Sequence, residues 1–208
     1  MSIGRAVRPL LGPFEAPAGR FYRNLFFNVR AFGQALRAWT RATCILDIGC
    51  GEGLVTEELR RVFPQAEITG IDVRPEVGTL FRGDRGRVTF VSEELAPFSR
   101  RNQSRFDLVV ISDVLHHVAP GDRPELLRSA VLVLRAGGGL AVKEWERRRN
   151  VAHLFAWISD RFITGDRVRF ETAESWRALA GAVVEGTVER EVRFPPWRNN
   201  FALFIRSR

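Results

Sequence analysis

A short run in the first third of the chain constrains the fold more than any other feature. Residues 45–53 read Ile-Leu-Asp-Ile-Gly-Cys-Gly-Glu-Gly, an apolar strand followed by a glycine-rich turn. Glycine adopts backbone conformations that other residues avoid, and it lets the backbone pass close to a bound molecule. In open α/β sheets, ligands bind at the carboxyl ends of the strands, where such turns lie. The run therefore predicts an α/β fold with a binding site beside this turn.

Short apolar stretches alternate with amphipathic stretches along the rest of the chain. This alternation is typical of βαβ units, which form a mostly parallel sheet covered by helices on both faces. We expect seven strands, at residues 44–48, 67–71, 88–91, 106–112, 139–144, 183–193 and 200–206. We expect helices at residues 20–39, 54–62, 75–81, 124–134, 151–162 and 172–179. Because Pro195 and Pro196 lie between the last two strands, these strands are expected to pair with each other and the last to run antiparallel.

Length and composition predict one domain in three parts. A chain of 208 residues with 45% apolar residues can bury a large core without disulfides. We expect a helical arm at 1–41, a ligand-binding core at 42–144, and lid helices with closing strands at 145–208. Cys44 and Cys50 lie in one strand and its own turn, so both are expected to be reduced thiols. Because no stretch predicts a signal peptide or a membrane span, we expect a cytoplasmic protein.

The positive charge of the chain is unevenly distributed. The net charge is +8, and Lys143 is the only lysine, so arginine carries nearly all of the positive charge. Residues 1–41 contain seven arginines and one acidic residue. This asymmetry is compatible with a nucleic-acid or anionic-lipid surface, but an arginine-rich composition with a solvated basic face explains it more simply. Since the aromatic and basic alternation of a nucleic-acid platform is missing, a nucleic-acid partner is not favoured.

The spacing of the glycine-rich turn indicates which ligand it binds. Dinucleotide sites use G-x-G-x-x-G, whereas this turn is G-x-G-x-G with Asp47 two residues before its first glycine. A carboxylate at that place repels a phosphate and suits a cationic group. Here the chain resembles the class I S-adenosylmethionine-dependent methyltransferases, in particular small bacterial members that act on small molecules. The resemblance implies a Rossmann-like three-layer sandwich, with cofactor contacts at Asp47, Gly49, Cys50, Gly51 and Gly53.

Two further segments continue the resemblance. The second strand ends in Asp72 and Val73, and the family's acidic residue at this place binds the ribose hydroxyls of the cofactor. After the third strand the family carries an acidic or polar residue that meets the adenine, and the sequence offers Ser92, Glu93 and Glu94. We choose Glu93, against the alternative that these glutamates only begin the next segment.

The fourth strand and the turn before the fifth complete the set. The strand at 106–112 runs into Ser-Asp-Val-Leu-His-His, like the family's fourth strand, so Ser112 and Asp113 are expected to border the cofactor and the substrate. The run Leu-Arg-Ala-Gly-Gly-Gly-Leu at 134–140 is similar to the family's turn before strand five, although Ala136 replaces the usual proline. S-adenosylmethionine is the implied cofactor.

The resemblance implies methyl transfer, and the polar residues after strand four suggest how an acceptor is activated. A histidine near neutral pKa can deprotonate a phenol or a carbon acid. We name His117 first as the base, His116 second, and Glu144 as a third polar group. The alternative is that the histidine pair only packs and holds its loop. No metal is expected, because Asp113 and Glu144 alone do not make an acidic metal cluster.

Three functions remain open at this point. The aromatic segment 145–162 favours an O- or C-methyltransferase acting on a hydrophobic small molecule, of phenolic or polyketide type, in secondary metabolism. The basic arm would suit an RNA or protein methyltransferase. A family member with other chemistry, such as a cyclase, is the third reading. The acceptor atom and the oligomeric state cannot be read from the sequence.

Overall fold

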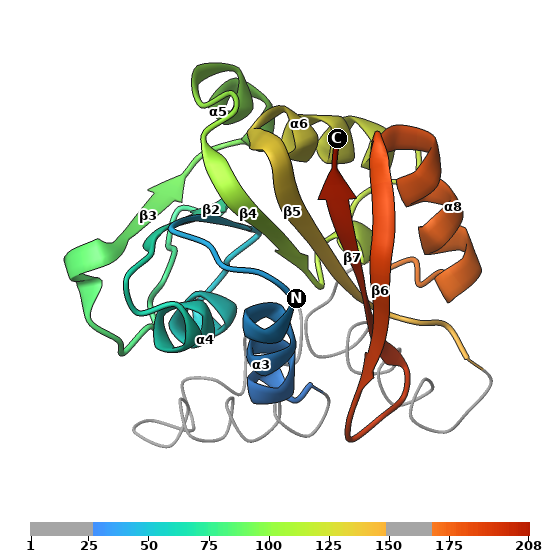
Figure 1. Cartoon of the computed structure of the whole chain (residues 1–208), viewed down its shortest axis with the longest axis horizontal. Helices are drawn as coiled ribbons and strands as arrows, with labels where there is room; N and C mark the ends of the chain where they lie inside the picture. Colours follow the sequence, from blue (N-terminus) through green and yellow to red (C-terminus); the bar gives the residue numbers. More distant parts are fainter. Residues whose placement is uncertain (1–26, 149–167) are drawn as a thin grey trace.

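A computed structural model describes residues 27–148 and 168–208, and all of its strands form one sheet in the order β3-β2-β1-β4-β5-β7-β6. The strands are β1 (Cys44–Ile48), β2 (Glu67–Asp72), β3 (Val88–Ser92), β4 (Phe106–Ser112), β5 (Leu134–Trp145), β6 (Gly186–Phe194) and β7 (Asn200–Ser207). The first five strands pair in parallel, while β7 runs antiparallel to both β5 and β6. Figure 1 shows β7 between its two neighbours. The expected seven-stranded, mostly parallel sheet is confirmed.

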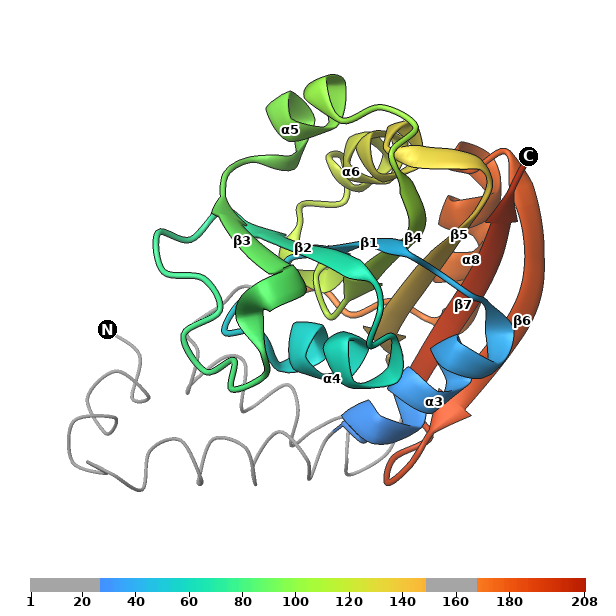
Figure 2. The ribbon, with the colours of Figure 1, turned by 60° about the vertical axis from the view of Figure 1, so that its left-hand side comes forward.

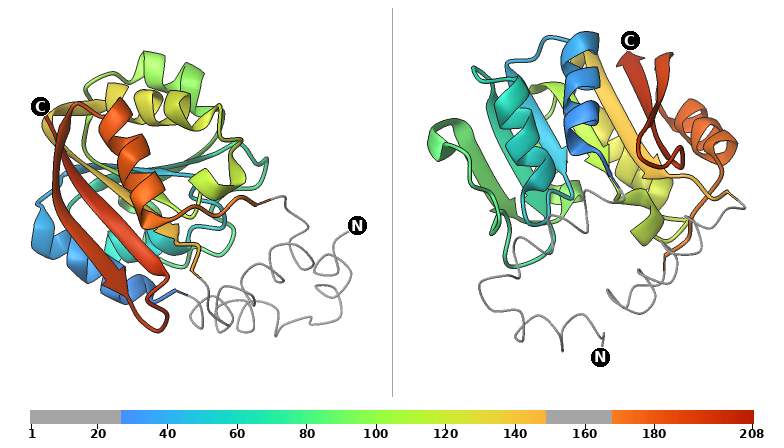
Figure 3. Two further views of the ribbon diagram at one scale, coloured as in Figure 1. Left: turned by 90° about the vertical axis from the view of Figure 1, so that its right-hand side faces the viewer. Right: turned by 90° about the horizontal axis from the view of Figure 1, so that it is seen from below.

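Helices cover both faces of the sheet, as the alternating pattern predicted. One face carries α3 (Val29–Trp39) and α4 (Leu54–Val62), and the other carries α5 (Leu95–Arg101), α6 (Arg123–Leu132) and α8 (Ala173–Val183). In Figure 2 the sheet lies between the two sets, and the right-hand view of Figure 3 shows the same three layers from below. Among the described helices, none is long and apolar enough to cross a membrane.

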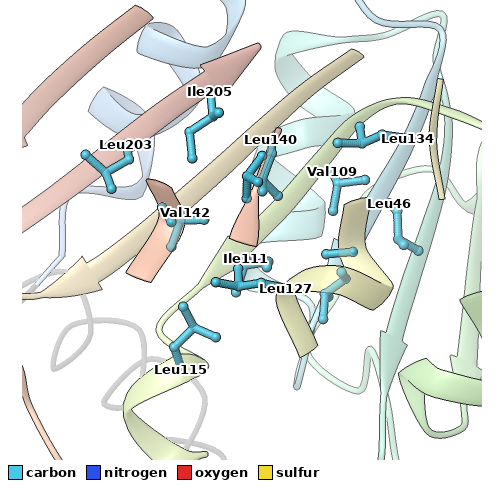
Figure 4. Close-up of a cluster of buried hydrophobic side chains, with 14 of the residues drawn as sticks. Leu46, Val109, Ile111, Leu115, Leu127, Leu134, Leu140, Val142, Leu203 and Ile205 are labelled. Carbon is cyan, nitrogen blue, oxygen red and sulfur yellow. The ribbon is translucent and has the colours of Figure 1, made fainter. Parts of the chain in front are cut away.

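Two apolar clusters form the core, one on each face. The cluster beneath α6 and α8 includes Leu46 and Val109 from the central strands and Leu127 from α6 (Figure 4). The cluster beneath α3 and α4 includes Phe32, which is completely buried against strands β6 and β7. The central strands are apolar on both sides because both faces are covered, which is why they read as continuous apolar runs.

The ends of two helices follow from single polar residues. The side chain of Asn28 accepts a hydrogen bond from the backbone N–H of Ala31, at 3.0 Å, and so caps the start of α3. Thr172 caps α8 through the N–H of Ser175 in the same way. Caps of this kind satisfy backbone donors that have no partner within the helix.

Several sequence predictions of element bounds are wrong. No helix forms at 75–81, where the chain makes bends and a turn around Gly78, whose φ is +64°. Helix α5 was not predicted, β5 begins five residues earlier than expected at Leu134, and α8 extends to Val183. The predicted helix at 151–162 and the first part of the one at 20–39 lie outside the described residues.

Candidate active site

A cavity of about 760 Å³ opens at the carboxyl ends of β1, β2, β3 and β4. Six predicted site residues line it, namely Gly49, Asp72, Val73, Glu93, Asp113 and His117. Ile48, Ile71, Arg74, Leu95, Val114, Val118 and Leu126 complete the lining. The remaining predicted residues are not in this lining: Asp47, Cys50, Gly51, Gly53, Ser112, His116 and Glu144. The cavity therefore lies where open α/β sheets bind ligands.

The glycine-rich turn needs its glycines at two places. The φ angle of Gly49 is +69°, and a Cβ there would lie 2.3 Å from Cγ2 of Val114. The φ angle of Gly51 is +53°, and a Cβ there would lie 2.3 Å from Nη2 of Arg74. The backbone N–H groups of Gly49 and Cys50 both donate to the carbonyl of Ile71, which ties the turn to the end of β2. The turn therefore has backbone without side chains at these two glycines, and its hydrogen bonds to Ile71 hold it in place.

Asp47 lies beneath the turn. Its side chain is buried, and Oδ2 accepts a hydrogen bond from the Thr56 hydroxyl at 2.6 Å. Burial raises the pKa of this carboxyl from 3.8 to about 7; the Thr56 bond opposes the rise and the nearby Asp72 adds to it. Burial also raises the pKa of the Cys50 thiol well above its usual range. Cys50 therefore remains a neutral thiol, and both cysteines of the chain are free.

Asp72 organises the opposite side of the turn. Its Oδ2 accepts the N–H of Gly51 at 2.9 Å, and its Oδ1 accepts the N–H of Arg74 at 3.0 Å. The guanidinium Nε of Arg74 lies 3.5 Å from the same Oδ1. Val73, the residue between them in the sequence, lines the cavity and is 70% exposed. An exposed apolar side chain beside a carboxylate suits an aromatic base linked to a sugar diol.

Glu93 and Ser112 are two further predicted cofactor contacts. Both carboxylate oxygens of Glu93 bind Arg101, at 2.6 and 2.7 Å, although Glu93 still lines the cavity. The hydroxyl of Ser92 donates to the carbonyl of Arg74, which fixes the loop after β2. The Ser112 hydroxyl is buried and has no hydrogen-bond partner in the described part of the chain.

Glu144 holds the histidine turn from below. It is fully buried, and its Oε1 accepts the backbone N–H groups of Val114 and Leu115, at 3.1 and 2.7 Å. Its Oε2 lies 2.6 Å from Nδ1 of His116, which is also buried. The His116 ring packs on His117 with 4.2 Å between centroids. His116 and Glu144 thus form the support, and the exposed His117 faces the cavity.

A buried arginine links this turn to the chain that precedes α8. Arg123 donates to the carbonyls of Val118 and Arg169, both at 3.0 Å, and its Nη1 lies 3.1 Å from Glu171. The N–H of Arg169 donates to the carbonyl of His116. Both ends of the histidine turn are therefore anchored to residues 169–171.

Sequence reasoning missed one contact at the site, between Asp113 and Lys143. Lys143 is 1% exposed, and its Nζ lies 2.5 Å from Oδ2 of Asp113. The φ angle of Asp113 is +56°, a left-handed conformation that few non-glycine residues adopt. The signal in the sequence was that Lys143 is the only lysine.

Asp113, His116 and Glu144 could together hold a metal ion, since one ligand atom from each lies within 4.8 Å of the others. Other protein groups already engage Glu144, His116 and one oxygen of Asp113. Lys143 pairs with Asp113, while two N–H groups and His116 engage Glu144. Metal binding would have to displace them, and metal-free chemistry stays a prediction.

A known protein family matches most of this chain. A methyltransferase domain family model matches residues 7–183, most of the chain. The chain belongs to this methyltransferase family. Its curated relatives include the ubiquinone biosynthesis O-methyltransferases of Xanthomonas euvesicatoria pv. vesicatoria, 26% identical over 78% of this chain and 71% of the relative, and of Xylella fastidiosa, 27% identical over 78% and 69%.

Solved methyltransferase structures share the fold. The 1,6-didemethyltoxoflavin-N1-methyltransferase of Burkholderia thailandensis, bound to S-adenosylhomocysteine, has a TM-score of 0.68 and 19% identity, with 97% of this chain and 87% of that chain covered. Mitomycin 7-O-methyltransferase has a TM-score of 0.69 and 19% identity, with 86% of this chain covered. This chain spans 54% of the length of that longer chain.

The protein is a class I S-adenosylmethionine-dependent methyltransferase, and its cavity fits that cofactor. Gly49 brings bare backbone to the cavity wall, where Val114 packs so closely that a Cβ would clash with it. Asp72 offers a carboxylate for hydroxyl donors, and Val73 offers an exposed apolar surface. When bound, the cofactor supplies a methyl group on a sulfonium, which becomes a neutral thioether after transfer.

Proposed function

We propose that this methyltransferase transfers a methyl group to an oxygen or carbon nucleophile of a hydrophobic small molecule, of phenolic or polyketide type. The observation that carries the proposal is the position of His117. Its exposed imidazole lines the same cavity as Gly49 and Asp72, so a base and the expected cofactor contacts share one space. His117 would take the proton of the acceptor, and the freed electron pair would form the new bond to the methyl carbon while the bond from that carbon to sulfur breaks and its electron pair stays on sulfur.

The proposed cofactor contacts are made by residues at the ends of β1 and β2. Asp72 would bind the ribose hydroxyls, Val73 would pack on the base, and the turn at 49–53 would lie against the methionine part. Asp47 supports the turn from beneath through Thr56. Alignment of the acceptor, the methyl carbon and the sulfur in one rigid pocket supplies most of the rate.

The apolar part of the lining supports a hydrophobic acceptor. Leu95, Val114, Val118 and Leu126 line the cavity. The relatives support a small molecule, since their names concern ubiquinone biosynthesis, toxoflavin and mitomycin. A role in secondary metabolism and a cytoplasmic location remain proposals drawn from the sequence. An RNA or protein substrate, which the basic residues at 1–41 would suit, is the second candidate. The test must distinguish this candidate from a small-molecule substrate.

The test is a labelling experiment. The purified protein is incubated with methyl-labelled S-adenosylmethionine and a lysate of the cells that make it, and the mixture is separated into organic-soluble, RNA and protein fractions. We expect label in the organic-soluble fraction, absent with a His117→Ala variant. Label confined to RNA or protein would refute the proposal.

A further inference from the structure

Lys143 is an unusual residue in this chain. It is the only lysine among 32 basic residues, and it is buried on β5 beside Ser112 of β4. Burial of an ammonium is costly unless a counter-charge and hydrogen-bond acceptors surround it. The presence of a buried lysine in such an arginine-rich chain therefore indicates that this position specifically requires an ammonium group.

The contacts of Lys143 show what the requirement is. Its Nζ lies 2.5 Å from Oδ2 of Asp113 and 3.9 Å from the centre of the Phe27 ring. An ammonium is a compact point charge, so it fits the narrow buried space between this carboxylate and this ring face, and it differs from the larger planar guanidinium in size and shape. The site is shaped for lysine.

Lys143 also fixes the backbone of Asp113. The N–H of Asp113 donates to the carbonyl of Lys143 at 2.9 Å, so the two residues are joined by two bonds. Asp113 adopts a left-handed conformation at the end of β4. Such conformations persist only where surrounding contacts hold them, and they gather at functional sites. The ion pair is one of those contacts.

The second oxygen of Asp113 remains available to the cavity. Asp113 lines the cavity together with His117, and its side chain is 35% exposed. Within residues 27–148 and 168–208, only Lys143 donates a side-chain hydrogen bond to this carboxylate. A carboxylate that is neutralised on one side and exposed on the other is an acceptor for a ligand's hydroxyl or amino group.

We infer that Lys143 is a positioning residue that holds the Asp113 carboxylate at the cavity wall, where Asp113 binds a hydrogen-bond donor of the methyl acceptor. The inference rests on the proposed function, because it takes this cavity as the acceptor site. It adds to that function a specificity: the preferred acceptor carries a second donor near the group that faces His117.

Binding of small aromatic probes tests the inference without turnover. Catechol and phenol, and 2-aminophenol and aniline, are titrated by ligand-observed NMR into protein loaded with S-adenosylhomocysteine. The wild-type protein should bind the probe with the second donor at least about fivefold more tightly, consistent with one charge-assisted hydrogen bond. Lys143→Met and Asp113→Asn should reduce the ratio to about one, and both should keep their affinity for S-adenosylhomocysteine within about twofold.

The controls separate this role from a structural one. Arg61→Met removes the bidentate partner of the buried Glu58 on α4, away from the cavity, and should leave the probe ratio unchanged. If Lys143→Met does not fold, Asp113→Asn still tests the inference, because asparagine tolerates a left-handed conformation. An equal affinity of wild-type protein for both probes, an unchanged ratio in the variants, or a loss of S-adenosylhomocysteine binding would overturn it. A preserved probe preference without label transfer to any small molecule would instead refute the proposed function alone.

Discussion

Glu144 Oε2 lies 2.6 Å from His116 Nδ1, with both side chains buried between β5 and the turn after β4. Because Oε1 of the same carboxylate accepts two backbone N–H groups, Glu144→Ala would leave these two groups and the His116 ring without their partner. We expect a loss of about 2–4 kcal/mol in the free energy of unfolding, measured by urea denaturation. Glu174→Ala, at an exposed position on α8, is the control. Equal stability of the two variants would contradict the supporting role of Glu144.

His117→Ala should separate chemistry from binding. His117 is exposed and lines the cavity, so its removal should not disturb the core. We expect kcat to fall by roughly 10²–10⁴, the usual contribution of a general base, while calorimetry finds unchanged affinity for S-adenosylhomocysteine. Full turnover by this variant would exclude His117 as the base.

Asp72→Ala should weaken cofactor binding. The change deletes the carboxylate proposed to bind the ribose and also the acceptor of the Gly51 and Arg74 N–H groups. We expect S-adenosylhomocysteine to bind about 10- to 100-fold more weakly in a calorimetric titration. The matched control is Asp84→Ala, which also removes an aspartate that pairs with an arginine, but at an exposed position. Unchanged binding by Asp72→Ala would refute the assignment.

Arg74→Ala should have the opposite effect. The Arg74 guanidinium lies beside Gly51 and 3.5 Å from Oδ1 of Asp72, where the ribose hydroxyls are proposed to bind. Removal of a competing partner should raise the affinity for S-adenosylhomocysteine by about two- to tenfold, since an exposed ion pair is weak. Arg87→Ala, which breaks the exposed pair with Glu67, should leave it unchanged. A weaker complex would mean that Arg74 is itself a cofactor contact.

Asp47 should make stability depend on pH. Burial raises the pKa of its carboxyl from 3.8 to about 7, so the folded protein binds this proton more tightly than the unfolded chain. The contribution is complete below pH 3.8 and is lost as pH rises through about 7, at most about 4 kcal/mol. Asp47→Asn cannot ionise, and its unfolding free energy should therefore fall less between pH 4 and 7. Parallel denaturation curves for both proteins would contradict the burial effect.

The sequence predicted the elements correctly where apolar runs were long. The prediction was wrong where a glycine or a proline is compatible with either a helix or a turn. The strand at 106–112 is a continuous apolar run and forms as expected. The predicted helix at 75–81 contains Gly78, which instead turns in a left-handed conformation and donates to the carbonyl of Gly51. Helix α5 was not predicted; Pro97 lies in its first turn, where no backbone donor is needed.

The sequence predicted several residues that line the candidate site. It did not predict which side chains of neighbouring strands contact each other there. The spacing of Gly49 and Asp72 placed both residues at one edge of the sheet, and both line the cavity. The pair of Asp113 and Lys143 depends on the register of β4 and β5, in which Ser112 lies opposite Lys143. One residue of slippage would turn Lys143 to the other face. Because β5 is buried on both faces from Gly138 onward, its apolar residues do not distinguish between the two registers.

The position of β7 has a consequence for the synthesis of this protein. β7 is translated after the other six strands of the sheet, yet it lies between β5 and β6. Until it is made, β6 has no neighbour and β5 presents an open edge, and such edges pair readily with other chains. During synthesis the sheet therefore passes through a stage with open edges, when the turn at Pro195 and Pro196 has been made and the strand after it has not.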